Sequence, residues 1–242
     1  MIQFLALRIL EIFDFFHKQK MMLFLKKNKF NNFKIIFDVG AHEGETIELY
    51  LKHFKIQKMY SFEPSYFSYN NLKKKINNIK NKKIKTEIII ENIALGAENK
   101  DIKIKHMNET SSSTIKELNK DSKYYKKKKK FLFNLKNKKL FTEIFAKQKK
   151  IDEYMSQKKI QKLDFLKIDT EGYEFEVLSG AKKNIKNINI ILFEHHYHDM
   201  LKKNYTFTDV HGLLNKNNFK QIYKAKMPFR KTFEYIYKNK TY

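Results

Sequence analysis

The fold of this chain is constrained most by a regular alternation of apolar strands and amphipathic helices that begins at residue 34. Strands are expected at residues 34–39, 58–63, 86–93, 102–106, 163–169, 188–195, 219–223 and 232–237. Helices are expected at residues 43–54, 66–79, 172–185 and 208–216. Buried strands separated by helices of this length predict an α/β fold with a mainly parallel sheet covered on both faces. Such a sheet places its functional site at the carboxyl ends of its strands.

Residues 1–30 are predicted to form a helical extension ahead of this pattern. Apolar residues recur at helical spacing from Ile2 to Phe16. Arg8, Glu11 and Asp14 interrupt every apolar run that is long enough to cross a bilayer. A helix packed on the domain is the preferred interpretation, and an amphipathic anchor at a membrane surface is the alternative.

Residues 31–242 are predicted to form one domain with a lysine-rich insertion around 116–150, which includes the run Lys126–Lys130. The whole chain has 51 basic and 26 acidic residues, which gives a net charge of +25. Only Arg8 and Arg230 are arginines, whereas nucleic-acid readers usually depend on arginine for bidentate contacts. An AT-rich coding bias therefore explains most of the charge, and a basic module that binds nucleic acid or a membrane surface is the alternative.

The same bias makes the scarce residue types informative. The chain has six glycines, where ordinary usage would give about 17. A glycine that persists is expected where the backbone requires it. The chain has no cysteine, which excludes a disulfide scaffold, a thiolate zinc site and a cysteine nucleophile.

The strongest motif is D-V-G-A-H-E-G at residues 38–44, between the first strand and its helix. Gly40 and Gly44 allow a tight turn and a close approach to a ligand at the helix N-terminus. Asp38 can accept hydrogen bonds from a cationic or amino-bearing ligand. The spacing matches neither the dinucleotide fingerprint nor the P-loop, so the loop suits a ligand without a phosphate at this point.

Two further motifs follow the next two strands. The segment S-F-E-P at residues 61–64 places Glu63 and Pro64 at a strand end, 25 residues after Asp38. A carboxylate at this position can accept hydrogen bonds from both hydroxyls of a ribose. The third strand ends at Asn92, Ile93 and Ala94, where an adenine ring would then lie.

The fourth motif is L-D-F-L-K-I-D-T-E-G-Y-E at residues 163–174. It places Lys167, Asp169 and Glu171 at the end of a buried strand, where charges are unfavourable unless they pair or bind a ligand. A purely structural lysine–carboxylate cluster is the alternative interpretation.

The segment E-H-H-Y-H-D at residues 194–199 follows the next strand. Glu194, His196 and His198 share one face of an extended chain and form a candidate metal site. We expect no metal, because histidines that are close in sequence splay apart. Glu194 is instead expected to contact substrate.

These motifs in this order, together with S-S-S-T at residues 111–114, I-D-E-Y at 151–154 and V-L-S-G-A at 177–181, resemble the FkbM family of methyltransferases. The resemblance implies a seven-stranded, Rossmann-like class I methyltransferase sheet with S-adenosylmethionine as cofactor. It also implies that Asp38, Gly40 and Gly44 wrap the amino-acid end of the cofactor and that Glu63 holds its ribose. Asn92, Ile93 and Ala94 would border the adenine, and Asp169, Glu171 and Glu194 would stand at the reaction centre.

The chain departs from the family at His42, where asparagine is common. Histidine also tolerates unusual backbone angles, so cofactor binding is expected to survive. The insertion is also longer than the resemblance implies.

The resulting expectation is O-methylation of a hydroxyl on a sugar, a glycan or a secondary metabolite. No N-P-P-Y loop follows the fourth strand of the sheet, which disfavours N-methylation. The base that accepts the hydroxyl proton stays open among Asp169, Glu171, Glu194 and His195. The expected partner is a small-molecule or glycan acceptor and no specific nucleic acid. The expected location is the cytoplasm, with membrane-surface contact by the N-terminal helix as the alternative.

Overall fold

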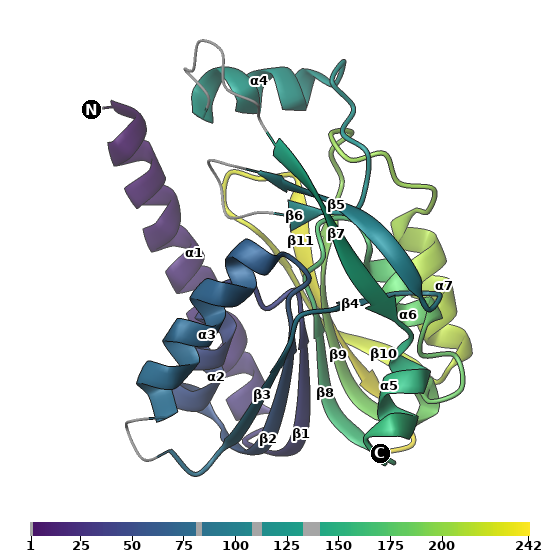
Figure 1. Ribbon diagram of the computed structural model, residues 1–242. Coiled ribbons are helices and arrows are strands. Elements are labelled where there is room, and N and C mark those ends of the chain that lie inside the picture. The colour runs from purple at the N-terminus through teal and green to yellow at the C-terminus, as the bar shows by residue number, and fades with distance from the viewer. Residues whose placement is uncertain (1, 81–83, 108–112, 133–140) are drawn as a thin grey trace.

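A seven-stranded sheet forms the centre of the protein (Figure 1). The computed structural model describes residues 2–80, 84–107, 113–132 and 141–242. In sheet order, the strands are β10 (Phe219–Lys226), β11 (Thr232–Asn239), β9 (Ile188–His196), β8 (Leu163–Ile168), β1 (Asn32–Val39), β2 (Lys55–Phe62) and β3 (Glu87–Glu91). Neighbouring strands from β9 to β3 run parallel, and β11 runs antiparallel to both of its neighbours. The predicted Rossmann-like sheet is confirmed.

Helices cover both faces of the sheet, as the strand–helix alternation predicted. One face is covered by α1 (Ile2–Lys27), α2 (Glu45–His53) and α3 (Tyr66–Lys80), and the other by α5 (Ile151–Gln157), α6 (Glu174–Ser179) and α7 (Phe207–Lys216). Successive residues of β1 point to opposite faces, so Ile36 packs in the core beneath α1–α3 and Phe37 in the core beneath α5–α7. Both cores are apolar and fully buried at the central strands.

The helix predicted at residues 172–185 is shorter in the structure. α6 ends at Ser179, turns follow, and one 3-10 turn (Ile185–Asn187) leads into β9. A Cβ on Gly180 would lie 2.0 Å from the carbonyl oxygen of Gly96, so the backbone of another segment passes directly against the end of this helix. That close approach explains why the chain retains a glycine here.

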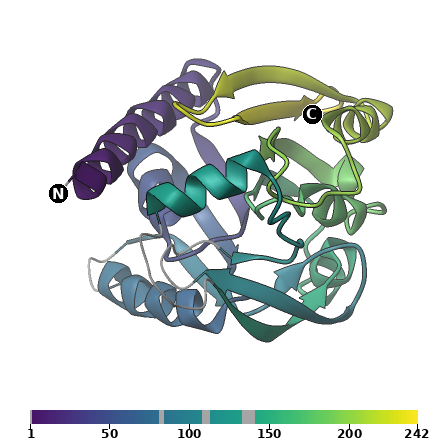
Figure 2. The ribbon, with the colours of Figure 1, turned by 90° about the horizontal axis from the view of Figure 1, so that it is seen from above.

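A second sheet lies beyond the carboxyl ends of the main strands. Its order is β4 (Ala94–Leu95), β7 (Phe141–Lys149), β5 (Lys100–Met107) and β6 (Ser113–Thr114). The added layer therefore begins at Ala94, ahead of the lysine-rich segment expected at 116–150. The whole run Lys126–Lys130 lies on α4 (Lys123–Leu132), which crosses the middle of the molecule when it is seen from above (Figure 2).

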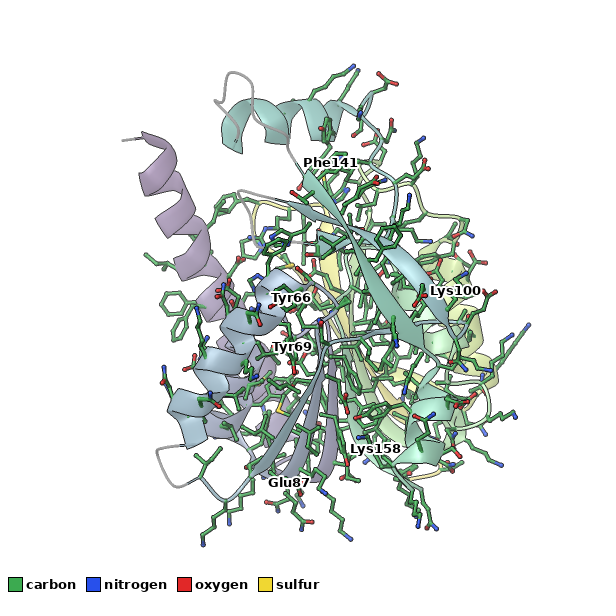
Figure 3. All side chains as sticks on the ribbon, viewed as in Figure 1. Tyr66, Tyr69, Glu87, Lys100, Phe141 and Lys158 are labelled. Carbon is green, nitrogen blue, oxygen red and sulfur yellow. The ribbon has the colours of Figure 1, made fainter. Side chains whose placement is uncertain are left out.

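The opposite end of the molecule carries the amino ends of the strands. Glu87 at the start of β3 forms an exposed ion pair of 2.8 Å with Lys58, and Lys158 lies at the same end (Figure 3). The cavity described below is at the other end.

The N-terminal helix α1 packs on the domain, as the preferred interpretation of the sequence predicted. Met22 and Leu25 of α1 are fully buried. His17 lies 2.6 Å from Glu234 of β11, and Asp14 lies 2.6 Å from Arg230 in the turn before that strand. Among the described residues, no helix is both long enough and apolar enough to cross a bilayer.

The turn after β1 yields a test of the fold. Gly40 has a φ of +80°, and a Cβ there would lie 1.8 Å from the carbonyl oxygen of Asp169. We expect Gly40→Ala to lower the free energy of unfolding by more than about 2 kcal/mol, since a left-handed conformation alone costs an L-residue about 1–2 kcal/mol. Gly212→Ala is the matched control, because Gly212 lies in α7 and, apart from its neighbours in the same helix, no described residue has an atom within 4 Å of the added Cβ.

The control should raise the free energy of unfolding by about 0.5–1 kcal/mol, the helix preference of alanine over glycine. Urea unfolding of both variants measures the two effects. Equal stability of the Gly40 variant and the wild type would contradict the close packing of the two loops.

Candidate functional site

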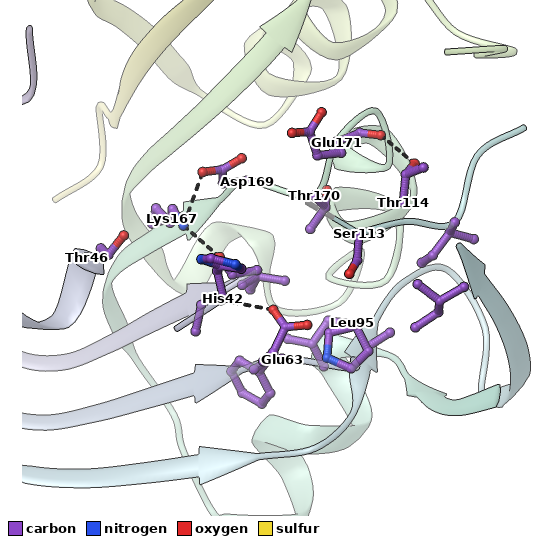
Figure 4. A pocket seen from close by; sticks show the side chains of 18 of the residues that line it. His42, Thr46, Glu63, Leu95, Ser113, Thr114, Lys167, Asp169, Thr170 and Glu171 are labelled. Carbon is purple, nitrogen blue, oxygen red and sulfur yellow. Dashed lines mark hydrogen bonds and ion pairs between the residues drawn. The ribbon is translucent and has the colours of Figure 1, made fainter. Parts of the chain in front are cut away.

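A cavity of about 560 Å³ opens at the carboxyl ends of β1, β2 and β8 (Figure 4). The order of the strands reverses between β8 and β1, which is where open α/β sheets bind their ligands. The second sheet adds residues from β4, β5 and β6 to the lining. The volume is in the range of small-molecule sites.

Lys167 of β8 joins the two central strands at the base of the cavity. The strand register pairs Lys167 with Asp38 of β1, and the Lys167 Nζ lies 3.0 Å from Asp38 Oδ1. The same nitrogen donates to the Gly40 carbonyl at 3.0 Å and lies 3.5 Å from Asp169 Oδ2. Burial disfavours the charged ammonium, but the carboxylates of Asp38 and Asp169 outweigh it and raise the pKa of Lys167. Lys167 therefore stays charged and holds the loops after β1 and β8 together.

The loop after β1 is fixed by backbone hydrogen bonds to β2. The amides of Gly40 and Ala41 both donate to the carbonyl of Phe62 at 3.0 Å. His42 has a φ of +50°, so histidine does adopt the unusual backbone angle expected of it. Its backbone amide donates to Glu63 at 2.9 Å, and its imidazole lies 3.0 Å from Glu45. The loop is thereby tied to the carboxylate at the end of β2.

Glu63 lies in the cavity wall and is only 4% exposed. Its two carboxylate oxygens accept hydrogen bonds from the backbone amides of His42 and Ser65, at 2.9 and 2.8 Å. Burial outweighs these hydrogen bonds and raises the pKa of Glu63 to about 6. Asn92 donates to the carbonyls of Glu63 and Pro64, so it braces the turn.

The loop after β8 forms the opposite wall. The side chains of Asp169, Thr170 and Glu171 line the cavity across from Glu63 (Figure 4). Glu171 has a φ of +48°, and its carbonyl accepts the hydroxyl of Thr114 from β6 at 2.9 Å. The second sheet thus fixes the conformation of this loop.

Behind this wall, Glu171 belongs to a cluster with two residues of β9. The Nε2 atom of His196 lies 2.9 Å from Glu171 and 3.4 Å from Glu194. Burial disfavours the imidazolium, but Glu171 and then Glu194 raise the pKa of His196 to about 9. His196 is therefore a cation at neutral pH and is held mainly by Glu171, whereas burial raises the pKa of Glu194 well above its ordinary value. His198 stacks on Tyr124 with ring centroids 4.3 Å apart.

His195 has different surroundings on the other face of β9. It packs against the rings of Tyr197, Tyr205 and Phe207 and is 2% exposed. Burial lowers the pKa of His195 to about 3. It does not line the cavity that carries Asp169 and Glu171.

A third wall comes from parts of the chain that are distant in sequence. Asp14 and Lys18 of α1 and Arg230 of the β10–β11 turn all line the cavity. Arg230 pairs with Asp14, whereas Lys18 has no ion-pair partner among the described residues. This wall is rich in hydrogen-bond donors.

The structure divides the predicted site residues into two groups. The residues that line the cavity are Gly40, His42, Glu63, Pro64, Ile93, Ala94, Asp169 and Glu171. Those that lie behind the lining are Asp38, Gly44, Asn92 and Glu194. Gly44 caps α2 with a φ of +90° and packs against Leu72 of α3.

Sequence reasoning missed Asp14, Lys18, Arg230 and Thr170. The sequence held one signal for Arg230: arginine, like proline, occurs only twice in this chain, so a retained arginine was a candidate functional residue. The motif at 111–114 was noted only as a resemblance. Ser113 and Thr114 of this motif line the cavity, whereas Ser111 and Ser112 lie outside the described residues.

The raised pKa of Glu63 makes a prediction for the ligand-free protein. Because the folded-state pKa lies above the ordinary value of 4.5, stability from this group is fully present below about pH 4.5 and is lost as the pH rises through about 6. Relative to Glu63→Gln, the wild type should lose about 2 kcal/mol of unfolding free energy between pH 4 and pH 7. Denaturant unfolding of both proteins across this range measures it. A difference that does not change with pH would contradict the burial of a titrating carboxyl.

Comparisons with known proteins agree with this geometry. Residues 38–220 match the family model of the methyltransferase FkbM domain. The match excludes α1 and β11. No curated protein sequence matches the chain.

Two of the crystal structures that share the fold are methyltransferases. Methyltransferase FkbM from Methylobacillus flagellatus KT has 14% identity and a TM-score of 0.52 over 85% of this chain, which spans 44% of that protein's length. Magnesium protoporphyrin IX methyltransferase from Synechocystis PCC 6803 was solved with bound S-adenosylmethionine. It has 7% identity and a TM-score of 0.52, and the match covers 94% of this chain and 80% of that protein's chain. The family model covers most of the chain, and the matched segment includes the residues of β1, β2 and β8 and their loops that line the cavity. The chain therefore belongs to the FkbM methyltransferase family.

Proposed function

We propose that the protein transfers the methyl group of S-adenosylmethionine to a hydroxyl oxygen of a sugar, a glycan or another polyol metabolite. Membership of the family supplies the class of reaction. The observation that carries the rest is one cavity with a buried carboxylate, Glu63, on one wall and two carboxylates, Asp169 and Glu171, on the facing wall. The first wall suits the cofactor and the second suits the reacting hydroxyl.

The residues of the first wall fit this cofactor. Each Glu63 oxygen accepts one backbone amide and retains acceptor capacity for a ribose hydroxyl. Ile93, Ala94 and Leu95 give an apolar surface for an adenine ring. Asp38, Gly44 and Asn92 lie behind the lining, and we assign them to positioning: Asp38 keeps Lys167 charged, and Asn92 holds the turn that presents Glu63.

The cofactor supplies an electrophilic methyl group on a positively charged sulfur. Asp169 and Glu171 stabilise positive charge at the reaction centre, and a carboxylate can accept the proton that the hydroxyl loses. We assign the proton to Glu171. Glu171 lines the cavity, and its partner His196 also lies 3.4 Å from Glu194, so the proton enters a cluster of two carboxyl groups around one imidazole. Asp169 is different, because it shares the ammonium of Lys167 with Asp38.

The other lining residues support a polar acceptor. Thr170, Ser113 and Thr114 carry hydroxyl groups, and Asp14, Lys18 and Arg230 add charged hydrogen-bond partners. A polyol presents several hydroxyls that such groups can bind. The sequence D-T-E-G after β8, in place of an N-P-P-Y loop, favours oxygen over nitrogen as the methyl acceptor.

Substitutions on the two walls are expected to affect different quantities, the rate of methyl transfer on one wall and the affinity for the cofactor on the other. Asp169→Asn and Glu171→Gln should each lower the rate of methyl transfer about 10²-fold or more, because each removes a charge used in turnover, while cofactor affinity changes less. Glu63→Ala should weaken binding of S-adenosylhomocysteine by about 1.5–3 kcal/mol, the range for a charge-assisted hydrogen bond.

Calorimetry with S-adenosylhomocysteine measures the affinity. Transfer of radiolabelled methyl groups from S-adenosylmethionine to a panel of neutral sugars, uronic acids and extracted polysaccharides measures turnover. Melting temperatures of the same preparations identify variants that merely misfold. Near-normal turnover in both carboxylate variants, or unchanged affinity in Glu63→Ala, would refute the assignment of the walls.

A further inference from the structure

Helix α1 carries a concentration of exposed apolar side chains. The described residues have eleven large apolar side chains that are exposed, and five of them are on α1: Ile12, Phe13, Phe15, Phe16 and Leu23. Phe16 is 58% exposed and Leu23 is 60% exposed. Single exposed apolar residues are ordinary on a protein surface, but five within twelve residues of one helix form a patch that calls for a partner.

The helix is apolar on two opposite faces. Met21, Met22 and Leu25 point inward and are buried in the core beneath α1–α3. Ile12, Phe16 and Leu23 are spaced by four and seven residues, so they share the outward face. Packing on the domain explains the first face and leaves the second without a function.

The patch continues onto the turn between β10 and β11. The ring of Phe13 lies edge-on to Phe229, with centroids 5.1 Å apart, and Phe229 is 74% exposed. The adjacent Arg230 pairs with Asp14, and His17 pairs with Glu234. The ion pair of Arg230 with Asp14 and the hydrogen bond between His17 and Glu234 fix α1 against β11, so the outward face is a preformed surface.

Lysines surround this outward face. Lys20 follows Phe16 by one helical turn, and Lys27 follows Leu23 by the same spacing. Lys20, Lys26 and Lys27 are exposed, and none of them forms an ion pair with a described residue. The whole chain has a net charge of +25. An apolar stripe bordered by cations has the chemistry of a helix that lies in the headgroup region of an anionic membrane.

We propose that the outward face of α1, with Phe229, docks the protein on the surface of an anionic lipid bilayer. Ile12, Phe16 and Leu23 would enter the acyl boundary, and the bordering lysines would contact lipid phosphates. The inward side of the same helix contributes Asp14 and Lys18 to the cavity wall. Docking would therefore hold the cavity beside the membrane surface. The proposal does not depend on the proposed methyl transfer.

Sedimentation with sucrose-loaded vesicles tests this proposal without cofactor or acceptor. The wild type should bind vesicles that contain phosphatidylglycerol, bind pure phosphatidylcholine vesicles much less, and lose binding as salt is added. The double variant Phe16→Ser/Leu23→Ser should partition at least about tenfold more weakly, because two apolar side chains no longer enter the bilayer.

Phe145→Ser is the matched control, since Phe145 is 75% exposed on β7 of the second sheet. It should leave vesicle binding within about twofold of the wild type. Melting temperature and S-adenosylhomocysteine affinity should be unchanged in both variants, because the substituted side chains are exposed.

Three results would overturn the proposal: no binding to anionic vesicles, equal binding to both kinds of vesicle, or equal loss in the Phe145 control. A dimer seen by light scattering, which the double variant abolishes while the wild type ignores vesicles, would instead make this face a contact between copies of the chain. Failure of vesicle binding would leave the methyl-transfer measurements intact, so the two proposals fail separately.

Discussion

The rest of the site depends on the buried ion pairs of Lys167. A lysine in the middle of a sheet is unfavourable unless carboxylates surround it, and here the register places Asp38 directly beside it. The same ammonium also reaches the Gly40 carbonyl and Asp169. One cation therefore joins the ends of β1 and β8, the two strands between which the cavity opens. Removal of either partner would leave a buried charge and release two loops at once.

The proposed division of the cavity into a cofactor wall and a reaction wall is supported by how its charges are paired. Glu171 is held by His196, Asp169 by Lys167, Glu45 by His42 and Asp14 by Arg230. Within the part of the chain that the structure describes, the Glu63 side chain is bonded only to backbone amides, so its carboxylate remains available to neutral hydroxyl donors. A ribose fits such a group better than a cation does. Asp169 and Glu171 face Glu63 across the cavity and are the carboxylates proposed to act in turnover.

Much of the fold and part of the site could be predicted because the signals are local. The buried strands carry continuous apolar runs, and D-V-G-A-H-E-G sets its own turn through Gly40 and the positive φ of His42. The remaining features depend on contacts that no local pattern encodes. Asp14 and Arg230 are 216 residues apart in sequence, yet they form one wall. His196 was noticed as a metal candidate, but only the folded chain places it between Glu171 and Glu194.

The central claim is that the cavity binds S-adenosylmethionine through the loops after β1, β2 and β8. Hydrogen–deuterium exchange with S-adenosylhomocysteine tests it most directly, because it reports on the backbone amides of these loops. Two of these amides, those of His42 and Ser65, bond to Glu63. The account predicts slower exchange at residues 40–45, 63–65 and 169–172 when the ligand is added, with no change on α4. Protection confined to α4, or no protection at the three loops under conditions where calorimetry shows binding, would contradict it.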